Sequence, residues 1–228
     1  MDLDIIYETD ELIAINKPHG LLVHRSRIAA DVSVFALQLV RDYLGHWVYP
    51  LHRLDRKTSG VLLFAKSEKI NSIIQKQFRE HTVKKKYEAI VRGYTEEHQS
   101  IDYPLTVDDK TQEAHTYFEL IKHYEIALPF GKFETSRYSH ILVTPTTGRF
   151  HQIRKHMKHI YHPILGDRPH GCNKQNKLWL EKFGLTKMML HAKELQIEFP
   201  EGEIVGISAG RSDEFERVLS VFSRIERI

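Results

Sequence analysis

The sequence has few of the features that mark secreted, membrane-bound or disulfide-stabilised proteins. It contains one cysteine, Cys172, among 228 residues, and a single cysteine cannot form an internal disulfide. It has no run of about 18 apolar residues, the length of a membrane-spanning helix. The acidic N-terminus, MDLDIIYETDE, has neither the basic start nor the apolar stretch of a signal peptide. These absences predict a cytoplasmic protein without a membrane anchor, in which Cys172 is a spare thiol.

The sequence also lacks the usual signs of a metal centre. Paired cysteines and an HExxH motif are both missing. Histidines are frequent between residues 151 and 162, and His156 and His159 are three residues apart, but Lys155 and Lys158 beside them would repel a bound cation. We therefore expect no metal and no other cofactor, and we expect these histidines to contact phosphate or to pack in the structure.

The charge is unevenly distributed although the net charge is only +3. Between Arg149 and Lys193 there are ten Lys and Arg against two Asp and Glu, together with six histidines. A second basic cluster lies between Lys76 and Lys86. This asymmetry fits a surface that faces a polyanion. On charge alone, an ordinary solvated face explains it equally well.

The length suits one large domain, or two lobes that share one sheet. Apolar residues recur with helical spacing in residues 31–45, where Gly45 ends the pattern, and again after Ser67, which has the position of an N-cap. Helices are also predicted at 149–160 and 212–225. Strand patterns occur at 12–18, 61–66, 86–93, 116–124, 136–144, 189–199 and 202–208. Because strands follow one another with few βαβ alternations, we predict an α+β fold with a mostly antiparallel or mixed sheet.

The helix predicted at 149–160 carries a conspicuous arginine. Phe150, Ile153, Met157 and Ile160 form its predicted core stripe. Arg154 lies in the first turns, where the helix dipole favours anions and not cations. Arg154 is therefore expected to have an anionic partner, either a carboxylate or a phosphate. The alternative is an ordinary exposed arginine on the helix surface, which would give the same spacing in the sequence.

One acidic residue stands among cations at the bend between two predicted strands. The stretch HRLDRKTSG places Asp55 near Arg53, Arg56 and Lys57. Nearby positive charge favours the ionised carboxylate, which can act as a nucleophile or a base. The alternative is an Asx-type turn without chemistry. No second acid lies nearby at the spacing of a glycosidase pair.

Several motifs, in order along the chain, resemble the RluA family of RNA pseudouridine synthases. HRLDRKTSG (52–60) is similar to the family's signature, and INKPHGLLVH (15–24) to its N-terminal motif. KKYEAIVRG (85–93) is similar to its tyrosine motif, and TGRFHQIRKHMKHIYHPILGD (147–167), followed by LHA (190–192), to its C-terminal motif. The resemblance covers almost the whole chain.

This resemblance implies a mixed α/β, pseudouridine-synthase-like fold with a long, largely antiparallel sheet, flanking helices and a central catalytic cleft. Residues 1–228 would form a single catalytic domain without an N-terminal S4-like domain, and we expect a monomer. The implied reaction detaches uracil from its ribose, turns it and rejoins it through carbon. It requires no redox change, energy source or metal.

The resemblance also implies roles for individual residues. Asp55 would be the catalytic aspartate, as a nucleophile at the ribose C1′ or as a base on the ribose. Tyr87 would stack under the flipped base, and Arg154 would pair with Asp55. Arg53 would enter the space that the base leaves, which offsets part of the cost of flipping. The residues expected to bind RNA are His52, Arg53, Arg56, Lys85, Arg149, His151 and Lys158.

The C-terminal motif departs from the usual family pattern. Tyr161 stands where a glycine is usual, and His170 where a tyrosine is usual. The stretch HIYHPILGDRPHGCNKQN (159–176) instead resembles the TruC branch, which modifies uridine 65 of tRNA. We therefore expect tRNA as the partner, with large-subunit rRNA as the alternative. A third hypothesis is an inactive RNA-binding module with the same fold. The presence of Asp55, Tyr87 and Arg154 argues against it.

Overall fold

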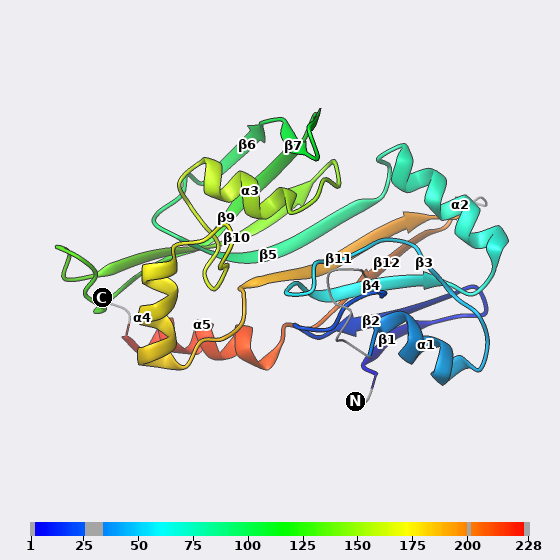
Figure 1. The fold of residues 1–228 in the computed structure, drawn as a ribbon, viewed down its shortest axis with the longest axis horizontal. Coiled ribbons are helices and arrows are strands. Elements are labelled where there is room, and N and C mark those ends of the chain that lie inside the picture. The colour runs from blue at the N-terminus through cyan, green and yellow to red at the C-terminus, as the bar shows by residue number, and fades with distance from the viewer. Residues whose placement is uncertain (1–2, 26–33, 200–201, 226–228) are drawn as a thin grey trace. The chain divides into compact units, whose positions relative to one another are not determined.

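The computed structural model describes residues 3–25, 34–199 and 202–225 and divides into two compact units (Figure 1). The first unit comprises residues 1–85 and 192–210, and the second comprises residues 86–191 and 211–228. Strands β5 (Lys84–Arg92) and β11 (Leu190–Glu198) each contribute residues to both units.

The first unit is built on antiparallel strand pairs. Strand β2 (Leu12–Lys17) pairs with β1 (Ile5–Glu8) on one side and with β4 (Ser59–Ala65) on the other. The short β3 (Tyr49–Pro50) also pairs with β4, and β11 pairs with β12 (Ile204–Ser208). All seven residues of β4 are buried. The strand that follows the Asp55 bend is therefore a rigid part of the core.

Two helices are described in the first unit, and each has one end that its sequence predicts. In α2 (Glu68–Arg79), the Ser67 side chain accepts a hydrogen bond from the Ile70 amide at 3.3 Å. Helix α1 (Ala36–Leu44) ends at Gly45, which has a φ of 72°. Of the residues expected to start this helix, 31–33 lie outside the described residues, and the helix begins only at Ala36.

The second unit also consists of antiparallel strands covered by helices. Its strands lie in the order β5, β10 (Ser136–Pro145), β9 (His115–Ile126) and β6 (His98–Asp102). A separate hairpin joins β7 (Leu105–Val107) to β8 (Lys110–Gln112). The helices are α3 (Gln152–His159), α4 (Asn173–Phe183) and α5 (Asp213–Ile225).

Strand β5 is buried on both faces because different helices pack on each side. Ile90 belongs to an apolar cluster with Trp179 of α4 and Phe222 of α5. Its neighbour Ala89 belongs to a cluster with Met157 of α3. Successive side chains of a strand point to opposite faces, so α4 and α5 cover one face and α3 covers the other.

The predicted fold class is confirmed, but two residues of the predicted helical stripes are wrong. The α+β class and the largely antiparallel strands are as expected. Phe150 precedes α3 and is 56% exposed, and Val34, in the apolar pattern of 31–45, precedes α1 and is 44% exposed. Met157 is fully buried as expected. None of the helices in the described ranges is long and apolar enough to span a membrane.

Gly60 provides a test of the packing beneath the Asp55 bend. Its φ is +110°, and an added Cβ would overlap the backbone carbonyl of Ala192. We expect Gly60→Ala to lower the free energy of unfolding by about 3 kcal/mol or more, through backbone strain and steric overlap. Urea denaturation measures this change. The control is Gly210→Ala, where no positive φ or neighbour within 4 Å opposes a Cβ. Equal effects of the two substitutions would contradict the prediction.

Candidate active site

The Asp55 bend lies in the first unit between β3 and β4 and is held by backbone hydrogen bonds. The Thr58 amide donates to the Asp55 carbonyl at 3.0 Å, closing a turn. The Gly20 amide donates to the Arg56 carbonyl at 2.7 Å. In return, Nε of Arg56 donates to the Gly20 carbonyl at 3.1 Å. The bend is thus attached to the segment that follows β2, and the half-buried Asp55 has a fixed backbone.

A buried lysine joins the same two segments. Lys17, the last residue of β2, has no exposed surface. Its Nζ donates to the carbonyl oxygens of Pro18 and Leu21, both at 2.9 Å, and of Arg56 at 3.3 Å. Burial lowers the pKa of Lys17 to about 7, while the negative charge of Asp55 acts in the opposite direction. Lys17 therefore connects the end of β2 to the bend and lies within electrostatic range of the candidate catalytic carboxylate.

Lys17 is not among the site residues predicted from the sequence, although its sequence context carries a signal. Its motif, INKPHGLLVH, contributes to the prediction only through the family resemblance. A lysine at the end of the mostly apolar strand LIAINK, next to Pro18, is unusual because lysine is rarely fully buried without partners. The partners here are backbone carbonyls, which a sequence does not identify.

The cations expected to bind RNA near Asp55 differ in their surroundings. Arg53 and Arg56 are exposed. Burial, and then the charge of Arg53, lower the pKa of His24, so the Arg53 guanidinium acts on this histidine. Burial also lowers the pKa of Lys85. The arginines thus have access to solvent, whereas Lys85 is largely enclosed.

His52 is a neutral, structural part of the bend. Its Nε2 accepts a hydrogen bond from the Leu63 amide at 3.1 Å, which requires an unprotonated Nε2. Burial lowers the pKa of His52 far below its usual range, and the charge of Lys85 adds to this effect. The ring also stacks on Phe78, with 5.5 Å between the ring centroids. Any contact between His52 and RNA would therefore not depend on positive charge.

In the second unit, Arg154 forms a buried, bidentate ion pair with Asp167. Its Nε donates to one carboxylate oxygen at 2.7 Å and its Nη2 to the other at 2.9 Å. The two side chains are only 4% and 1% exposed. The expectation of an anionic partner is confirmed, and this partner is a carboxylate. Breaking such a pair leaves an uncompensated buried charge and costs ~3–5 kcal/mol.

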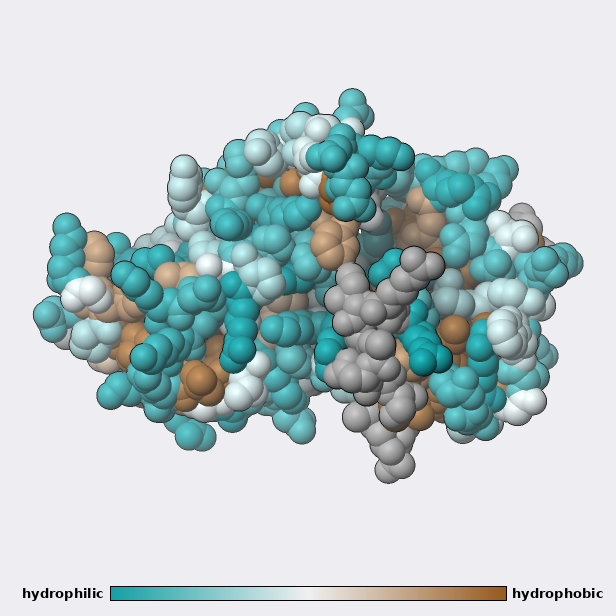
Figure 2. All heavy atoms as spheres, viewed as in Figure 1, coloured by the Kyte–Doolittle hydropathy of each residue, from teal (hydrophilic) through white to brown (hydrophobic). Residues whose placement is uncertain are grey.

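The segment before α3 presents an aromatic and basic surface. His151 has a left-handed backbone, with φ of 57°, and its Nδ1 lies 2.9 Å from Nε2 of His170. Phe150 stacks on the His151 ring at a centroid distance of 3.7 Å. Lys158 is exposed. Hydrophilic residues cover much of the viewed surface over α3 (Figure 2). Flat rings beside cations are typical of surfaces that stack bases.

Arg149 and His156 make local contacts within the second unit. Nε of Arg149 donates to the Glu113 carbonyl at 2.9 Å. His156 is fully buried and bonds Oγ1 of Thr116 and the Tyr103 carbonyl, each at 2.9 Å. Packing thus accounts for His156, one of the two outcomes expected for these histidines. Within the described ranges, no group of three or more potential metal ligands occurs.

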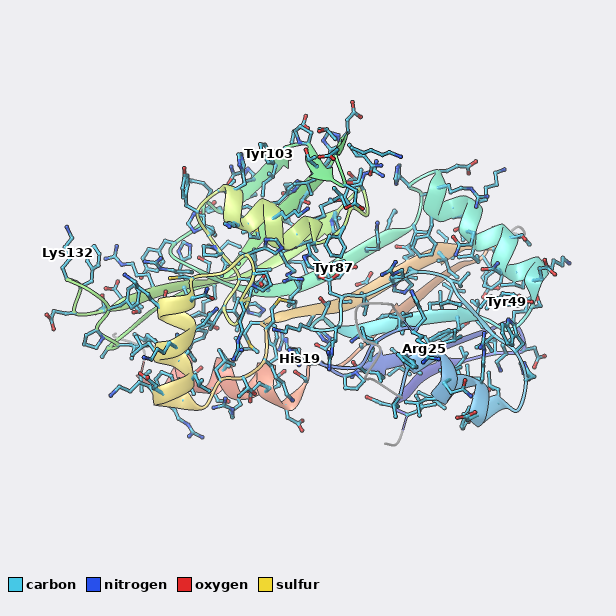
Figure 3. The ribbon with its side chains drawn as sticks, in the orientation of Figure 1. His19, Arg25, Tyr49, Tyr87, Tyr103 and Lys132 are labelled. Carbon is cyan, nitrogen blue, oxygen red and sulfur yellow. The ribbon has the colours of Figure 1, made fainter. Side chains whose placement is uncertain are left out.

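Tyr87 lies on β5, opposite Val143 of β10 (Figure 3). It is half-buried and packs against the apolar cluster that includes Met157 of α3. The sheet register therefore fixes the position of this ring. The pairing of Asp55 with Arg154 stays a prediction, because the two residues belong to different units.

With this geometry established, comparisons with known proteins identify the family. The model of the family described as RNA pseudouridylate synthase matches residues 11–159. This chain belongs to the RNA pseudouridylate synthase family. The matched span contains Asp55, Tyr87 and Arg154 but ends before Asp167. The enzyme class expected from the sequence, an isomerase that acts on RNA, is therefore confirmed.

Individual relatives in this family cover nearly the whole chain. The tRNA pseudouridine synthase C of Haemophilus ducreyi is 44% identical, over 97% of this chain and 96% of its own. The protein of that name in Vibrio cholerae is 42% identical, over 96% of each chain. Among solved structures, human RNA Pseudouridylate Synthase Domain Containing 1 has a similar fold, with a TM-score of 0.75, 20% identity and coverage of 100% and 97%.

The lowered pKa of Lys17 predicts a specific dependence of stability on pH. Its folded-state pKa is about 7, below the ordinary value of 10.5. Between these values the unfolded chain binds more protons, so stability should increase with pH by up to ~1.4 kcal/mol per unit. Lys17→Met should remove this increase, because methionine has no proton to release. Urea denaturation of both proteins at pH 7 and pH 9 measures the difference.

The matched control for this prediction is Lys69→Met, which removes an exposed lysine of α2. This variant should keep the dependence of the wild-type protein. The prediction would be wrong if Lys17→Met also retained the wild-type rise in stability between the two pH values.

Proposed function

We propose that this enzyme converts uridine to pseudouridine in tRNA, at position 65, with Asp55 as the catalytic residue. The observation that carries the choice of substrate is the 44% identity, over almost the full length of both chains, to a protein named tRNA pseudouridine synthase C. Large-subunit rRNA has no comparable support among these relatives. We further propose that residues 1–228 act as one catalytic domain, in a cytoplasmic monomer that needs no cofactor.

The setting of Asp55 supports its proposed role. Its backbone is fixed by the turn to Thr58, and its side chain is half-buried. A carboxylate held in this way loses little conformational freedom when it meets the ribose, which favours reaction. As a nucleophile it would attack C1′, and as a base it would remove a ribose proton. Both steps use the ionised carboxylate.

The proposed partners of Asp55 are Tyr87 and Arg154. Tyr87 would stack under the flipped base, and its place on β5 gives the ring a fixed orientation. Arg154 would pair with the Asp55 carboxylate. Its bidentate contact with Asp167 supports this role, because it holds the guanidinium plane in one orientation. Asp167 would then be a positioning residue for Arg154.

The proposed RNA contacts separate into two groups by exposure. Arg53, Arg56 and Lys158 are exposed and can neutralise phosphates or, for Arg53, fill the space of the flipped base. The other proposed contacts are more enclosed or already bonded within the protein: His52, Lys85, Arg149 and His151. We propose that these four shape the RNA-binding surface more than they add charge to it.

Replacement of the Asp55 carboxylate tests the catalytic assignment. Asp55→Asn keeps the size of the side chain but removes the negative charge, so pseudouridine formation should fall by at least ~1,000-fold. RNA binding should remain within about threefold, because the arginines of the bend are unchanged. Tritium release from labelled tRNA and electrophoretic binding measure the two quantities. Asp10→Asn, at an exposed position of the same unit, is the control. Normal turnover by Asp55→Asn would refute the role.

Mapping of pseudouridine in cells tests the substrate. Deletion of the gene should remove pseudouridine from position 65 of tRNA and leave the rRNA sites unchanged. Expression of the wild-type chain should restore the modification, whereas Asp55→Asn should not. Loss of a site in large-subunit rRNA, with tRNA unaffected, would overturn the choice of substrate while leaving the enzyme class intact.

A further inference from the structure

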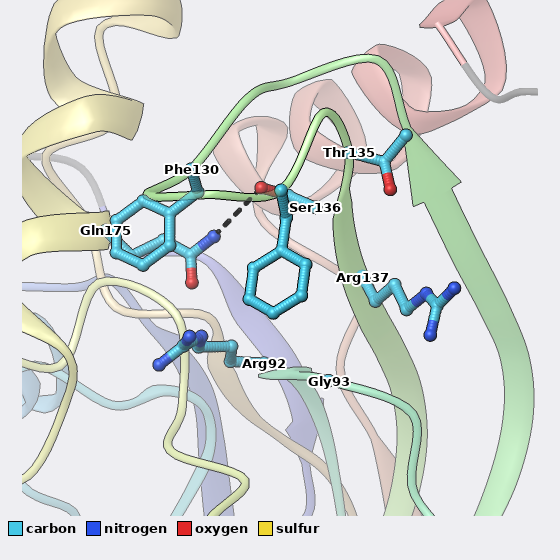
Figure 4. A pocket seen from close by; sticks show the side chains of 8 residues that line it. Arg92, Gly93, Phe130, Thr135, Ser136, Arg137 and Gln175 are labelled. Carbon is cyan, nitrogen blue, oxygen red and sulfur yellow. Dashed lines mark hydrogen bonds between the residues drawn. The ribbon is translucent and has the colours of Figure 1, made fainter.

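A pocket of about 260 Å³ lies entirely within the second unit, beside the turn that joins β9 to β10 (Figure 4). Its lining includes none of Asp55, Tyr87 and Arg154, and none of the residues proposed above to bind RNA. Two phenylalanines, two arginines and the amide of Gln175 form most of its wall. Its volume is just below the ~300 Å³ at which pockets for drug-sized ligands begin, so it suits a small group.

The two phenylalanines are held by a tight turn. The Phe130 amide donates to the Phe133 carbonyl at 2.9 Å, and the Phe133 amide donates back to the Phe130 carbonyl at 3.2 Å. Residues that exchange both hydrogen bonds lie directly opposite each other, with their side chains on the same face. Phe133 is nevertheless 59% exposed. The turn, whose tip carries Lys132 (Figure 3), thus presents a largely exposed aromatic ring, with Nζ of Lys132 5.6 Å from its centroid.

Gln175 of α4 presents an unpartnered polar atom to this pocket. The residue is 2% exposed. Its Nε2 donates to the Tyr138 hydroxyl at 2.5 Å and to Oγ of Ser136 at 3.4 Å. Its Oε1 is buried and has no hydrogen-bond partner among the described residues. A buried acceptor without a donor is costly, and a ligand with an N–H or O–H group would satisfy it.

Arg92 supplies the positive charge of the pocket. Its guanidinium lies over the Phe130 ring at 5.1 Å, and Nη1 donates to Sγ of Cys172 at 3.7 Å. Across the described ranges, no carboxylate forms an ion pair with it. Arg137, the second arginine, is paired with Glu125 at 3.2 Å. Figure 4 shows Arg92 on the same side of the pocket as Phe130 and Gln175, whereas Arg137 lies on the other side. The charge available for an anion is therefore that of Arg92.

We propose that this pocket binds one unpaired nucleotide of the RNA substrate. The base stacks on Phe133 and donates an N–H of its pairing edge to Oε1 of Gln175, while Arg92 contacts the adjoining phosphate. Aromatic faces, a hydrogen-bonding amide and an arginine together match the way proteins recognise unstacked RNA bases. The proposal rests on the proposed function for the source of the nucleotide, but the chemistry of the pocket does not depend on Asp55.

Nucleotide binding can be measured directly on the full chain labelled with ¹⁵N in its glutamine side chains. Adenosine 5′-monophosphate should shift the Gln175 side-chain amide resonance in a saturable manner. Ribose 5-phosphate, which carries the same phosphate without a base, should shift it far less. An equal response to the two compounds would mean that the pocket recognises only the phosphate, which would overturn the proposed recognition of a base. No response to adenosine 5′-monophosphate would overturn the proposal altogether.

Variants of Phe133 connect the pocket to the RNA substrate. Because the side chain is exposed, Phe133→Ala should fold normally, and it should raise KM for the tRNA and Kd for nucleotide about fivefold or more through lost stacking. Phe133→Trp should retain wild-type values because indole also stacks. Leu180→Ala, at a 42% exposed site on α4 outside the pocket, is the control and should change neither constant.

The outcomes separate this proposal from the proposed function. If the wild-type chain modifies tRNA and Phe133→Ala does so with unchanged KM, the pocket does not bind the substrate, and the catalytic assignment is unaffected. If the wild-type chain does not modify tRNA, the proposed function fails. In that case the nucleotide titration still decides whether the pocket binds a base.

Discussion

The buried amino group of Lys17 makes the hydrogen bonds on which the geometry of the Asp55 bend depends. An amino group without exposed surface is tolerated only where acceptors surround it, and here three backbone carbonyls do so. One of these carbonyls belongs to Arg56, the residue after Asp55. The end of β2 is thereby held to the bend before β4, just beyond the last pair of the two strands, Lys17 with Gly60. A catalytic carboxylate on an unrestrained loop would lose this precision.

In the second unit, an ion pair holds a candidate catalytic side chain in place. Arg154 and Asp167 are both buried, so each requires the other to offset the cost of leaving water. The bidentate contact also fixes the plane of the guanidinium. Asp167 is itself held, since its carbonyl accepts a hydrogen bond from the Asn176 side chain at 2.7 Å. Thus in both units a candidate catalytic group is supported by buried hydrogen bonds from a basic side chain or to an acidic one, and these supporting contacts need not touch the substrate.

Much of the fold can be predicted from the sequence because its elements have strong local signals. The pair of β9 and β10 and the helix α2 with its Ser67 cap are read directly from alternation and spacing. Helix α4 was missed because only Gln175 and Trp179 of its eleven residues are buried, so it lacks an apolar stripe. Strand β6, with the sequence HQSID, is too polar to show alternation and gains its structure from pairing with β9.

The site was less predictable, because its supporting contacts join residues that are distant in sequence. The family resemblance indicated Asp55, Tyr87 and Arg154. Neither motif nor charge indicated that Lys17 would bond the Arg56 carbonyl, 39 residues away. Phe150 is the opposite case, a residue for which the sequence pattern gave a wrong prediction. Its spacing matched the core stripe of α3, but the left-handed backbone at His151 starts the helix after it and leaves its ring exposed on His151.

The structure also changes what the basic composition means. The sequence suggested a polyanion-binding surface from its excess of Lys and Arg, but burial divides these residues into two kinds. Lys17 and Arg154 are buried and donate hydrogen bonds to other groups of the protein, so they add little to the electrostatic potential at the surface. Arg53, Arg56 and Lys158 are exposed and can release counterions on meeting phosphate. Affinity for RNA should therefore depend on the exposed cations, whereas the buried Lys17 and Arg154 should matter for the alignment of the candidate catalytic groups.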